Sequence, residues 1–290
     1  MEGKRICVVG ATGVLGRALI PLLLEEGYQV RALARLTDEK RSWLPKETDC
    51  RNFDLLSDNA PDELPSLVSG FDAVLHIATA IPRDFNAPGA WDSNTKLRTI
   101  GTRRLLDAAI SGNVGYYIQQ SITMRYPDCG EAWIDEDTPL ISTDQSGNPD
   151  TVTVMENIVT SSGTQLDWCI LRGGIFVGPR TFQVDTIREL KNGTKLVPGD
   201  GMNFMSLIHV QDMAAAFARA LQTTPHNEIL NIVTEPIRNG EYLDQLADSV
   251  GAARPKRDPH QPKPASNRCS NVRAKSVLQW TPRHSIFPSA

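Results

Sequence analysis

The feature that most constrains this chain is a glycine-rich turn near its N-terminus, between an apolar segment and an amphipathic one. The turn reads Gly10-Ala-Thr-Gly-Val-Leu-Gly16, and the apolar residues 6–9 precede it. Residues 13–26 follow, with leucines on one side of a helical period. A strand that enters a helix through glycines at this spacing predicts a βαβ unit that holds a dinucleotide.

Each glycine of the turn has a separate expected role. Gly10 permits the tight exit from the strand, Gly13 lets the backbone approach a pyrophosphate, and Gly16 allows the helix to pack closely on the sheet. Thr12, Val14 and Leu15 complete the turn. The first N–H groups of the helix, together with its partial positive charge, would hold the phosphates.

The first half of the chain alternates short apolar runs with longer amphipathic segments. We expect strands at residues 5–10, 28–33, 50–54, 73–78, 116–121 and 167–172, and helices at 13–26 and 91–110. Strands separated by helix-length spacers predict an α/β fold of the Rossmann type, a doubly wound parallel sheet. Residues 151–160 are rich in β-branched side chains, which favours a strand, but their place between the fifth and sixth strands favours a helix. We predict the helix.

The regular alternation of apolar runs and amphipathic segments ends after Phe176. We expect a nucleotide-binding domain at residues 1–176 and a smaller substrate-binding lobe at 177–290, interleaved with it and unable to fold alone. The segment from Arg254 to the end is rich in proline and arginine. It is either a basic arm or, as its apolar residues 277–278, 280 and 286–287 suggest, a tail that wraps back onto the protein.

The end of the second strand bears on which dinucleotide binds. NAD-binding folds place an acidic residue there for the ribose 2′-hydroxyl. This chain has Arg35, and the nearest acid, Asp38, follows the strand. A guanidinium suits a 2′-phosphate, so the sequence predicts NADP(H). Arg31, on the same strand face, is either an outer partner of that phosphate or a solvated side chain.

Composition excludes several classes of function. The chain has 290 residues, is 40% hydrophobic and carries a net charge of −4, which argues against nucleic acid as a partner. Its five cysteines form no Cys-x-x-Cys pair, so we expect neither a disulfide framework nor a metal site. No apolar run reaches roughly 18 residues and no secretory leader is evident, so we expect a cytoplasmic protein without a membrane partner.

At this point the chain resembles a known family, the extended and atypical short-chain dehydrogenase/reductases, which include NAD-dependent epimerase/dehydratase-like proteins. The motifs that carry the resemblance are Gly10–Gly16, Asp54-Leu55, Val74-Leu-His-Ile-Ala78, Gly101-Thr-Arg-Arg-Leu-Leu-Asp-Ala-Ala109, Leu171-Arg-Gly-Gly-Ile-Phe-Val-Gly-Pro179 and Ile208-His-Val-Gln-Asp-Met-Ala214.

The resemblance implies roles for matching positions. Asp54 and Leu55 would contact the adenine, and Ile77, Ala78 and Thr79 would line the ribose and phosphates. Ser121 takes the place of the family's active-site serine or threonine, and the turn containing Gly174 and Ile175 would lie near the nicotinamide. His209 and Asp212 belong to a family motif that we interpret as structural.

The family's catalytic pair, Tyr-x-x-x-Lys, is missing. Alignment through Glu156 places Asn148 and Val152 at the two positions; between Ser121 and Arg172 the sequence has no lysine, and its one tyrosine is Tyr126. The family's asparagine on the preceding helix is replaced by Arg98. As substitutes, Ser121 and Thr123 could hydrogen-bond a carbonyl oxygen and Tyr126 could act as an acid. Asp128, Glu131 and Glu156 are further candidates for a carboxylate base.

Three functions remain open on the sequence. The first is an NADP(H)-dependent oxidoreductase with non-standard catalytic residues, acting on a small, fairly apolar substrate with an anionic or carbonyl group. The second is a non-redox isomerase, cyclase or lyase on the same fold, and the third is a non-catalytic NADP-binding regulator. We expect a monomer or homodimer whose partner is a small molecule.

Overall fold

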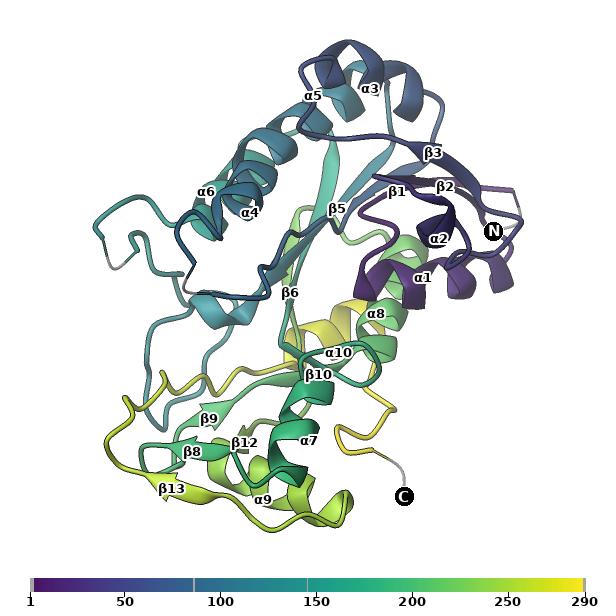
Figure 1. Ribbon diagram of the computed structural model, residues 1–290. Coiled ribbons are helices and arrows are strands. Elements are labelled where there is room, and N and C mark those ends of the chain that lie inside the picture. Colours follow the sequence, from purple (N-terminus) through teal and green to yellow (C-terminus); the bar gives the residue numbers. More distant parts are fainter. Residues whose placement is uncertain (1–2, 86, 145, 289–290) are drawn as a thin grey trace. The chain divides into compact units, whose positions relative to one another are not determined.

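The computed structural model describes residues 3–85, 87–144 and 146–288. Its centre is a seven-stranded sheet with the order β11-β6-β5-β4-β1-β2-β3 (Figure 1). The strands are β1 (Arg5–Val9), β2 (Gln29–Ala34), β3 (Asp49–Asn52), β4 (Ala73–His76), β5 (Tyr116–Ile122), β6 (Asp167–Gly173) and β11 (Glu228–Ile232). The pairs β1–β2, β1–β4, β2–β3 and β4–β5 are parallel. The predicted Rossmann-type fold is confirmed.

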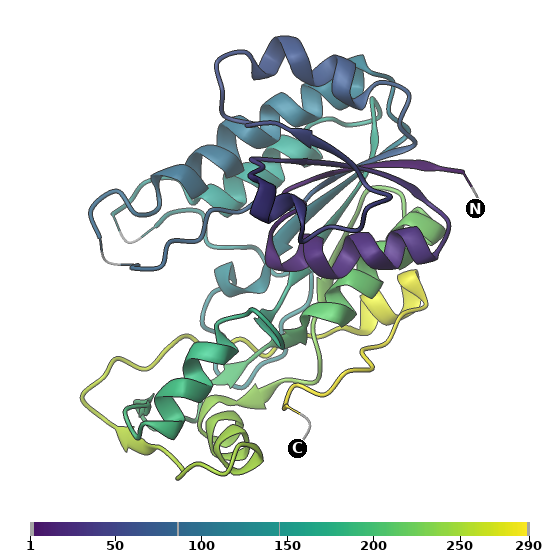
Figure 2. The same cartoon turned by 45° about the vertical axis from the view of Figure 1, so that its right-hand side comes forward.

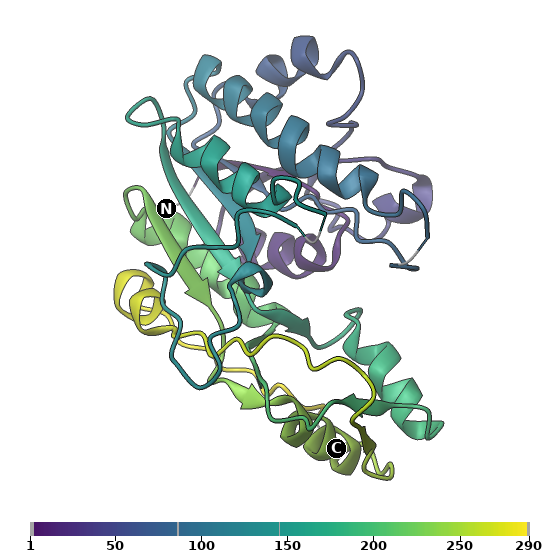
Figure 3. The same ribbon diagram turned by 90° about the vertical axis from the view of Figure 1, so that its left-hand side faces the viewer.

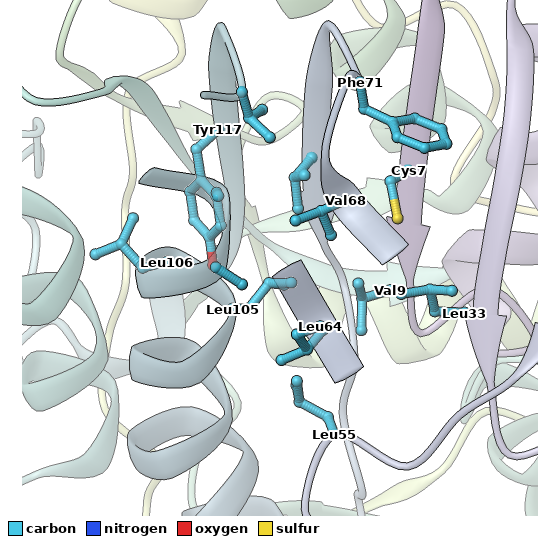
Figure 4. Close-up of a cluster of buried hydrophobic side chains, with 14 of the residues drawn as sticks. Cys7, Val9, Leu33, Leu55, Leu64, Val68, Phe71, Leu105, Leu106 and Tyr117 are labelled. Atoms are coloured by element: carbon cyan, nitrogen blue, oxygen red, sulfur yellow. The ribbon is translucent and has the colours of Figure 1, made fainter. Parts of the chain in front are cut away.

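Helices cover the two faces of this sheet (Figures 1 and 2). One face carries α3 (Ala60–Val68), α5 (Thr102–Ser111) and α6 (Thr151–Thr160), a layer that is turned toward the viewer in Figure 3. The other face carries α1 (Val14–Glu25). Figure 4 shows the core beneath the first layer, where Leu64, Leu105 and Leu106 of the helices meet Val9 and Tyr117 of the sheet. Strands buried on both faces explain the continuous apolar runs in the sequence.

The predicted helix at residues 151–160 is confirmed as α6. Asp150 caps it, because its carboxylate accepts hydrogen bonds from the N–H groups of Val152 and Thr153. Val152, Met155 and Val159 are buried at helical spacing. The β-branched residues therefore serve as the packed face of a crossover helix, and tertiary context overrides their strand propensity.

The long helix expected at residues 91–110 is confirmed, but it contains a π-helical turn that was not expected. The segment consists of α4 (Asp92–Lys96), a π-helical turn η1 (Leu97–Gly101) and α5. Gly101 lies against Leu55, and a Cβ atom at this position would come within 2.9 Å of the leucine Cδ2. Sequence periodicity cannot show a π turn of this kind, which inserts a residue into an otherwise continuous helix.

The chain divides into two compact units, which interleave in the sequence. The first contains the chain up to Ser121, residues 142–171 and residues 217–229. The second contains residues 122–141, residues 172–216 and the chain from Leu230 onward. The assignment of nucleotide binding to 1–176 and substrate binding to 177–290 stays a prediction.

The second unit contains three small two-stranded sheets. β7 (Ile175–Val177) pairs with β10 (Leu207–His209), β9 (Phe204–Met205) with β12 (Ile237–Arg238), and β8 (Leu196–Pro198) with β13 (Lys256–Asp258). The remaining helices of the described chain are α2 (Asp38–Arg41), η2 (Thr123–Arg125), α7 (Gln183–Lys191), α8 (Val210–Thr223), α9 (Asn239–Ser249) and α10 (Val272–Leu278). In the described ranges we find no helix with the length and apolarity that a membrane crossing requires.

The C-terminal tail is fastened to the second unit at Asp212. The indole Nε1 of Trp280 donates to the Asp212 carbonyl at 3.1 Å, and the N–H groups of Arg283 and His284 donate to its carboxylate at 3.0 and 2.9 Å. The carboxylate also lies 2.7 Å from His284 Nδ1. The tail thus folds back onto the protein up to Pro288; residues 289–290 lie outside the described chain.

Candidate active site

The glycine turn has the geometry that close approach of a ligand requires. Gly10 has a φ of +98°, and a Cβ atom here would lie 2.5 Å from both Cα and N of Ala78. A Cβ atom at Gly16 would overlap the carbonyl oxygen of Ala11. No other residue type fits either position without displacing backbone.

The N-terminus of α1 is open to a ligand. Gly13 is its N-cap, no side chain of the described residues caps it, and no acidic residue lies in its first turn. The N–H groups of Val14, Leu15 and Gly16 therefore remain for an external acceptor. By contrast, the N-terminus of α6 in the same unit is capped by the Asp150 side chain. An anion such as a pyrophosphate fits the uncapped end of α1.

A cavity of about 240 Å³ lies beside this turn, within the first unit. Of the residues predicted to bind cofactor, nine line it: Gly10, Thr12, Gly13, Arg35, Asp54, Leu55, Ile77, Ala78 and Thr79. Asp54 is held in place by a hydrogen bond that its carboxylate accepts from the N–H of Leu56, at 3.0 Å. The structure thus brings together residues from the ends of β1, β2, β3 and β4 around one cavity.

Two residues that line the cavity near Arg35 were not predicted from the sequence. Lys40 and Trp43 line the cavity together with Arg35. The Lys40 ammonium reaches the Arg35 carbonyl at 3.4 Å, and the Arg17 guanidinium lies 4.5 Å from the centre of the Trp43 ring. Lys40 is the third residue of the short helix α2, and this helix was not predicted from the sequence.

Arg31 does not belong to this wall. Its guanidinium forms an ion pair with Asp49 at 2.7 Å, donates to the Leu67 carbonyl and lies over the Phe71 ring. The Arg31 and Arg51 guanidinium groups hold the pKa of the Asp49 carboxyl below its ordinary value, although partial burial acts in the opposite direction. Both readings of Arg31 are therefore wrong: it is neither a phosphate ligand nor solvated, but a link between β2 and β3.

The loop after β4 is fixed from α4. The buried Asn94 accepts a hydrogen bond from the N–H of Ala80 at 3.0 Å, and its neighbours Ser93 and Leu97 line the cavity. Arg98, which replaces the family's asparagine, instead donates to the Thr151 hydroxyl at 3.2 Å. Asn94 therefore positions the backbone that is expected to lie along the cofactor.

His76 precedes that loop and is buried in a polar cluster that the sequence did not reveal. Its Nδ1 lies 3.0 Å from Gln119 Oε1 and 3.3 Å from the hydroxyls of Thr102 and Tyr117. Its Nε2 has no hydrogen-bond partner among the described residues. Burial lowers the pKa of His76 to about 4, so the imidazole is neutral at physiological pH.

Ser121 is buried at the end of β5 and bonded to a carboxylate. Its hydroxyl donates to Glu156 Oε1 at 2.5 Å, and Glu156 is itself buried on α6. Because the hydroxyl proton is directed at Glu156, the serine oxygen offers its lone pairs to any further partner. The carboxylate thus sets which hydrogen-bonding role Ser121 can take.

The remaining predicted residues lie in the second unit. Thr123 is buried and donates to the Gly173 carbonyl at 3.4 Å. Gly174 is packed against backbone, because a Cβ atom there would lie 2.6 Å from the Ser206 carbonyl oxygen. Ile175 donates its N–H to that same oxygen at 2.9 Å.

Tyr126 is only 2% exposed, and its hydroxyl is fully engaged. It donates to Asn231 Oδ1 at 2.9 Å and accepts from Arg172 Nη1 at 2.6 Å. Burial raises the Tyr126 pKa well above its ordinary value, which makes the phenol a weaker acid. These contacts favour a structural role for Tyr126 as the partner of the buried Arg172.

Asn148 and Val152, which the sequence analysis aligned with the family's catalytic pair, are not placed to act as acid and base. Asn148 is exposed and precedes the first residue of α6, and Val152 is fully buried within that helix. Glu156, one turn beyond Val152, is the residue of this helix that reaches a predicted site side chain.

Comparison with known proteins identifies the family. The pattern of the NAD-dependent epimerase/dehydratase family matches residues 6–233. The chain belongs to this family. Its members share an NAD(P)-dependent chemistry of the short-chain dehydrogenase/reductase type, so the resemblance found in the sequence is confirmed and the protein is an enzyme of that type.

Relatives of this epimerase/dehydratase member include both reductases and dehydratases. The 3-diazoavenalumate denitrifying reductase of a Streptomyces species is 29% identical, over 97% of this chain and 96% of that protein. Among solved structures, the enzyme WbmH of Bordetella bronchiseptica with NAD+ has a TM-score of 0.80 at 20% identity, covering 98% and 95% of the two chains. The dTDP-glucose 4,6-dehydratase DesIV of Streptomyces venezuelae has a TM-score of 0.79 at 21% identity, covering 97% and 92%. At these identities the solved structures establish the fold.

Proposed function

We propose that the protein is an NADP(H)-dependent oxidoreductase that reduces a small, fairly apolar organic substrate. The observation that carries the choice of cofactor is the wall formed by Arg35 and Lys40 where β2 ends. Two cations suit a 2′-phosphate through charge-assisted hydrogen bonds. Asp54, the one carboxylate among the described residues that line the cavity, belongs to the segment after β3 rather than to the end of β2.

We propose the following cofactor-binding residues in each unit. In the first unit they are Gly10, Thr12, Gly13, Val14, Leu15, Gly16, Arg35, Lys40, Asp54, Leu55, Ile77, Ala78, Thr79 and Ser121; in the second they are Gly174 and Ile175. When bound, NADPH supplies a hydride. We propose that Ser121 and Thr123 contact the substrate, and that Tyr126 supports Arg172.

The missing tyrosine and lysine limit what can be reduced. Hydride addition to a carbonyl creates an alkoxide, which needs a proton from a well-placed acid. A diazonium group needs none, because hydride neutralises it and dinitrogen leaves. The full-length relative is named as a denitrifying reductase of a diazo compound. We therefore propose an organic diazonium ion as the substrate class, with the net reaction R–N2+ + NADPH → R–H + N2 + NADP+.

The test compares two substrates that share a ring and a carboxylate, 4-carboxybenzenediazonium and 4-carboxybenzaldehyde. NADPH loss is followed by absorbance, and benzoate or 4-carboxybenzyl alcohol by chromatography, against a protein-free control and the variant Gly10→Val. We expect one benzoate per NADPH from the diazonium ion and no alcohol above the protein-free rate. Comparable reduction of the aldehyde would contradict the substrate class, and no protein-dependent NADPH loss with either would contradict the reductase assignment.

The same assay separates the alternative functions. Product formation that persists without nucleotide would favour the isomerase, cyclase or lyase. NADPH binding without turnover would favour the regulator. A cytoplasmic location and a monomeric or homodimeric state remain predictions, the second open to light scattering.

A further inference from the structure

Four side chains of the second unit form a continuous stack of alternating rings and guanidinium groups. The Arg268 guanidinium lies 4.2 Å from the centre of the Trp133 ring and 4.8 Å from that of Phe204. On Phe204, the Arg238 guanidinium lies 4.3 Å from the ring centre. We call Trp133, Arg268, Phe204 and Arg238 the cation–π stack. The three contacts form one series, because Arg268 and Phe204 each take part in two of them.

The two arginines of the stack differ in charge balance. Arg238 is neutralised by Glu131, with its Nη1 at 3.1 Å from Oε1 and its Nη2 at 2.8 Å from Oε2. Arg268 donates one hydrogen bond, to the Glu131 carbonyl oxygen at 3.0 Å, and forms no ion pair with any carboxylate in the described ranges. A guanidinium has five N–H groups, so Arg268 keeps donors for a further acceptor.

The outer end of the stack is open. Trp133 is 51% exposed, and Arg268 is half-buried between the two rings. Contact with both the Trp133 and Phe204 rings restricts the orientation of the Arg268 guanidinium. The stack therefore presents an aromatic surface beside a rigid donor edge.

Hydrogen bonds connect the stack to the turn that is expected to lie at the nicotinamide. Ser206 donates from its hydroxyl to the Asn267 carbonyl at 2.8 Å and accepts from the Cys269 N–H at 3.0 Å, on either side of Arg268. Its carbonyl oxygen accepts the N–H of Ile175 at 2.9 Å. One buried residue thus holds both Arg268 and the turn at Gly174–Ile175 in place.

We propose that Trp133 and Arg268 recognise the substrate as an aromatic carboxylate, with its ring against Trp133 and its carboxylate accepting hydrogen bonds from Arg268. The assignment rests on the proposed reductase function and names the substrate class more closely. An aromatic ring fits the exposed edge of the indole, on the side from which its carboxylate can reach the Arg268 guanidinium. A monoanion fits because Arg238 is already neutralised, which leaves one unpaired positive charge in the stack.

The experiment measures binding of three probes to the full chain with NADP+ by calorimetry: trans-cinnamate, cinnamamide and cyclohexanecarboxylate. The wild-type protein is expected to bind cinnamate at least about tenfold more tightly than either other probe, because each lacks one of the two contacts. Arg268→Gln should weaken cinnamate binding about tenfold or more and change cinnamamide binding less than about twofold. Trp133→Leu should weaken both aromatic probes about three- to tenfold, and Trp133→Phe should restore most of this loss.

Arg254→Gln is the matched control, because Arg254 is an exposed arginine of the same unit that pairs with Asp248. It should bind all three probes as the wild type does, and all variants should keep the wild-type affinity for NADP+. The proposal is overturned if the wild type does not prefer cinnamate, or if Arg268→Gln keeps that preference. Binding of cinnamate does not require turnover, so this result stands apart from the assay of reduction.

Discussion

Replacing Arg35 by alanine should weaken NADPH binding and leave NADH binding unchanged. Arg35 is exposed where it lines the cavity, so solvent screens its attraction for a 2′-phosphate. We take about 1–1.5 kcal/mol, which is at or just below the lower limit for a hydrogen bond to a charged group because solvent screens the contact. This corresponds to about a five- to twelvefold loss of affinity. Lys40 lines the same wall and should contribute a similar amount, so the double variant should lose on the order of a hundredfold.

The assay is titration of each nucleotide by its fluorescence, at low and high ionic strength. Salt should reduce the wild-type preference for NADPH, because the Debye length falls from about 8 Å at physiological ionic strength to about 3 Å at 1 M. Arg51→Ala is the control, since Arg51 is an exposed arginine of the same unit that pairs with Asp49. A wild-type preference for NADH, or an Arg35→Ala variant that loses both nucleotides equally, would refute the assignment of Arg35 to the 2′-phosphate.

Three further predictions concern single side chains. Gly10→Ala should abolish NADPH binding at concentrations that saturate the wild type, because its Cβ would lie 2.5 Å from the Ala78 backbone; wild-type affinity would show that the turn can shift. Tyr126→Phe should lower the free energy of unfolding in urea by about 1–3 kcal/mol, because it leaves the buried Arg172 without its hydroxyl partner. Loss of turnover at unchanged stability would instead make Tyr126 catalytic. The neutral His76 should make stability fall as pH drops from about 6.5 to about 4, by about 3 kcal/mol in all, since the unfolded chain takes up a proton that the folded chain excludes; His76→Gln should lack this dependence in urea titrations at each pH.

The parts of the fold that could be predicted are those whose cause is local. Glycines at positions 10, 13 and 16 between a strand and a helix specify the turn directly, and the apolar runs specify buried strands. The helix at residues 151–160 could not be predicted from its own residues, whose propensity favours a strand. It was predicted because the segment connects two parallel strands, and such a right-handed crossover usually contains a helix. Topology, rather than composition, made that prediction.

The parts that could not be predicted depend on contacts between distant residues. Whether Arg31 faces a ligand or an acid depends on Asp49, which the pairing of β2 with β3 places beside it. Lys40 reaches the cavity through a helix of only four residues, too short for a periodic signal. The burial of Tyr126 depends on Arg172 and on Asn231, far along the chain. Sequence periodicity contains none of these pairings.

The position of β11 at the edge of the sheet affects how the protein is synthesised. β11 pairs with β6, although β7–β10 and α8 come between them in the sequence. Until a ribosome has added β11, the β6 backbone has unpaired donors and acceptors beside Cys169, Ile170 and Leu171, all fully buried in the finished protein. A nascent chain halted before Glu228 thus exposes the unpaired backbone edge of β6. Exposed strand edges of this kind bind chaperones or a second copy of the same intermediate.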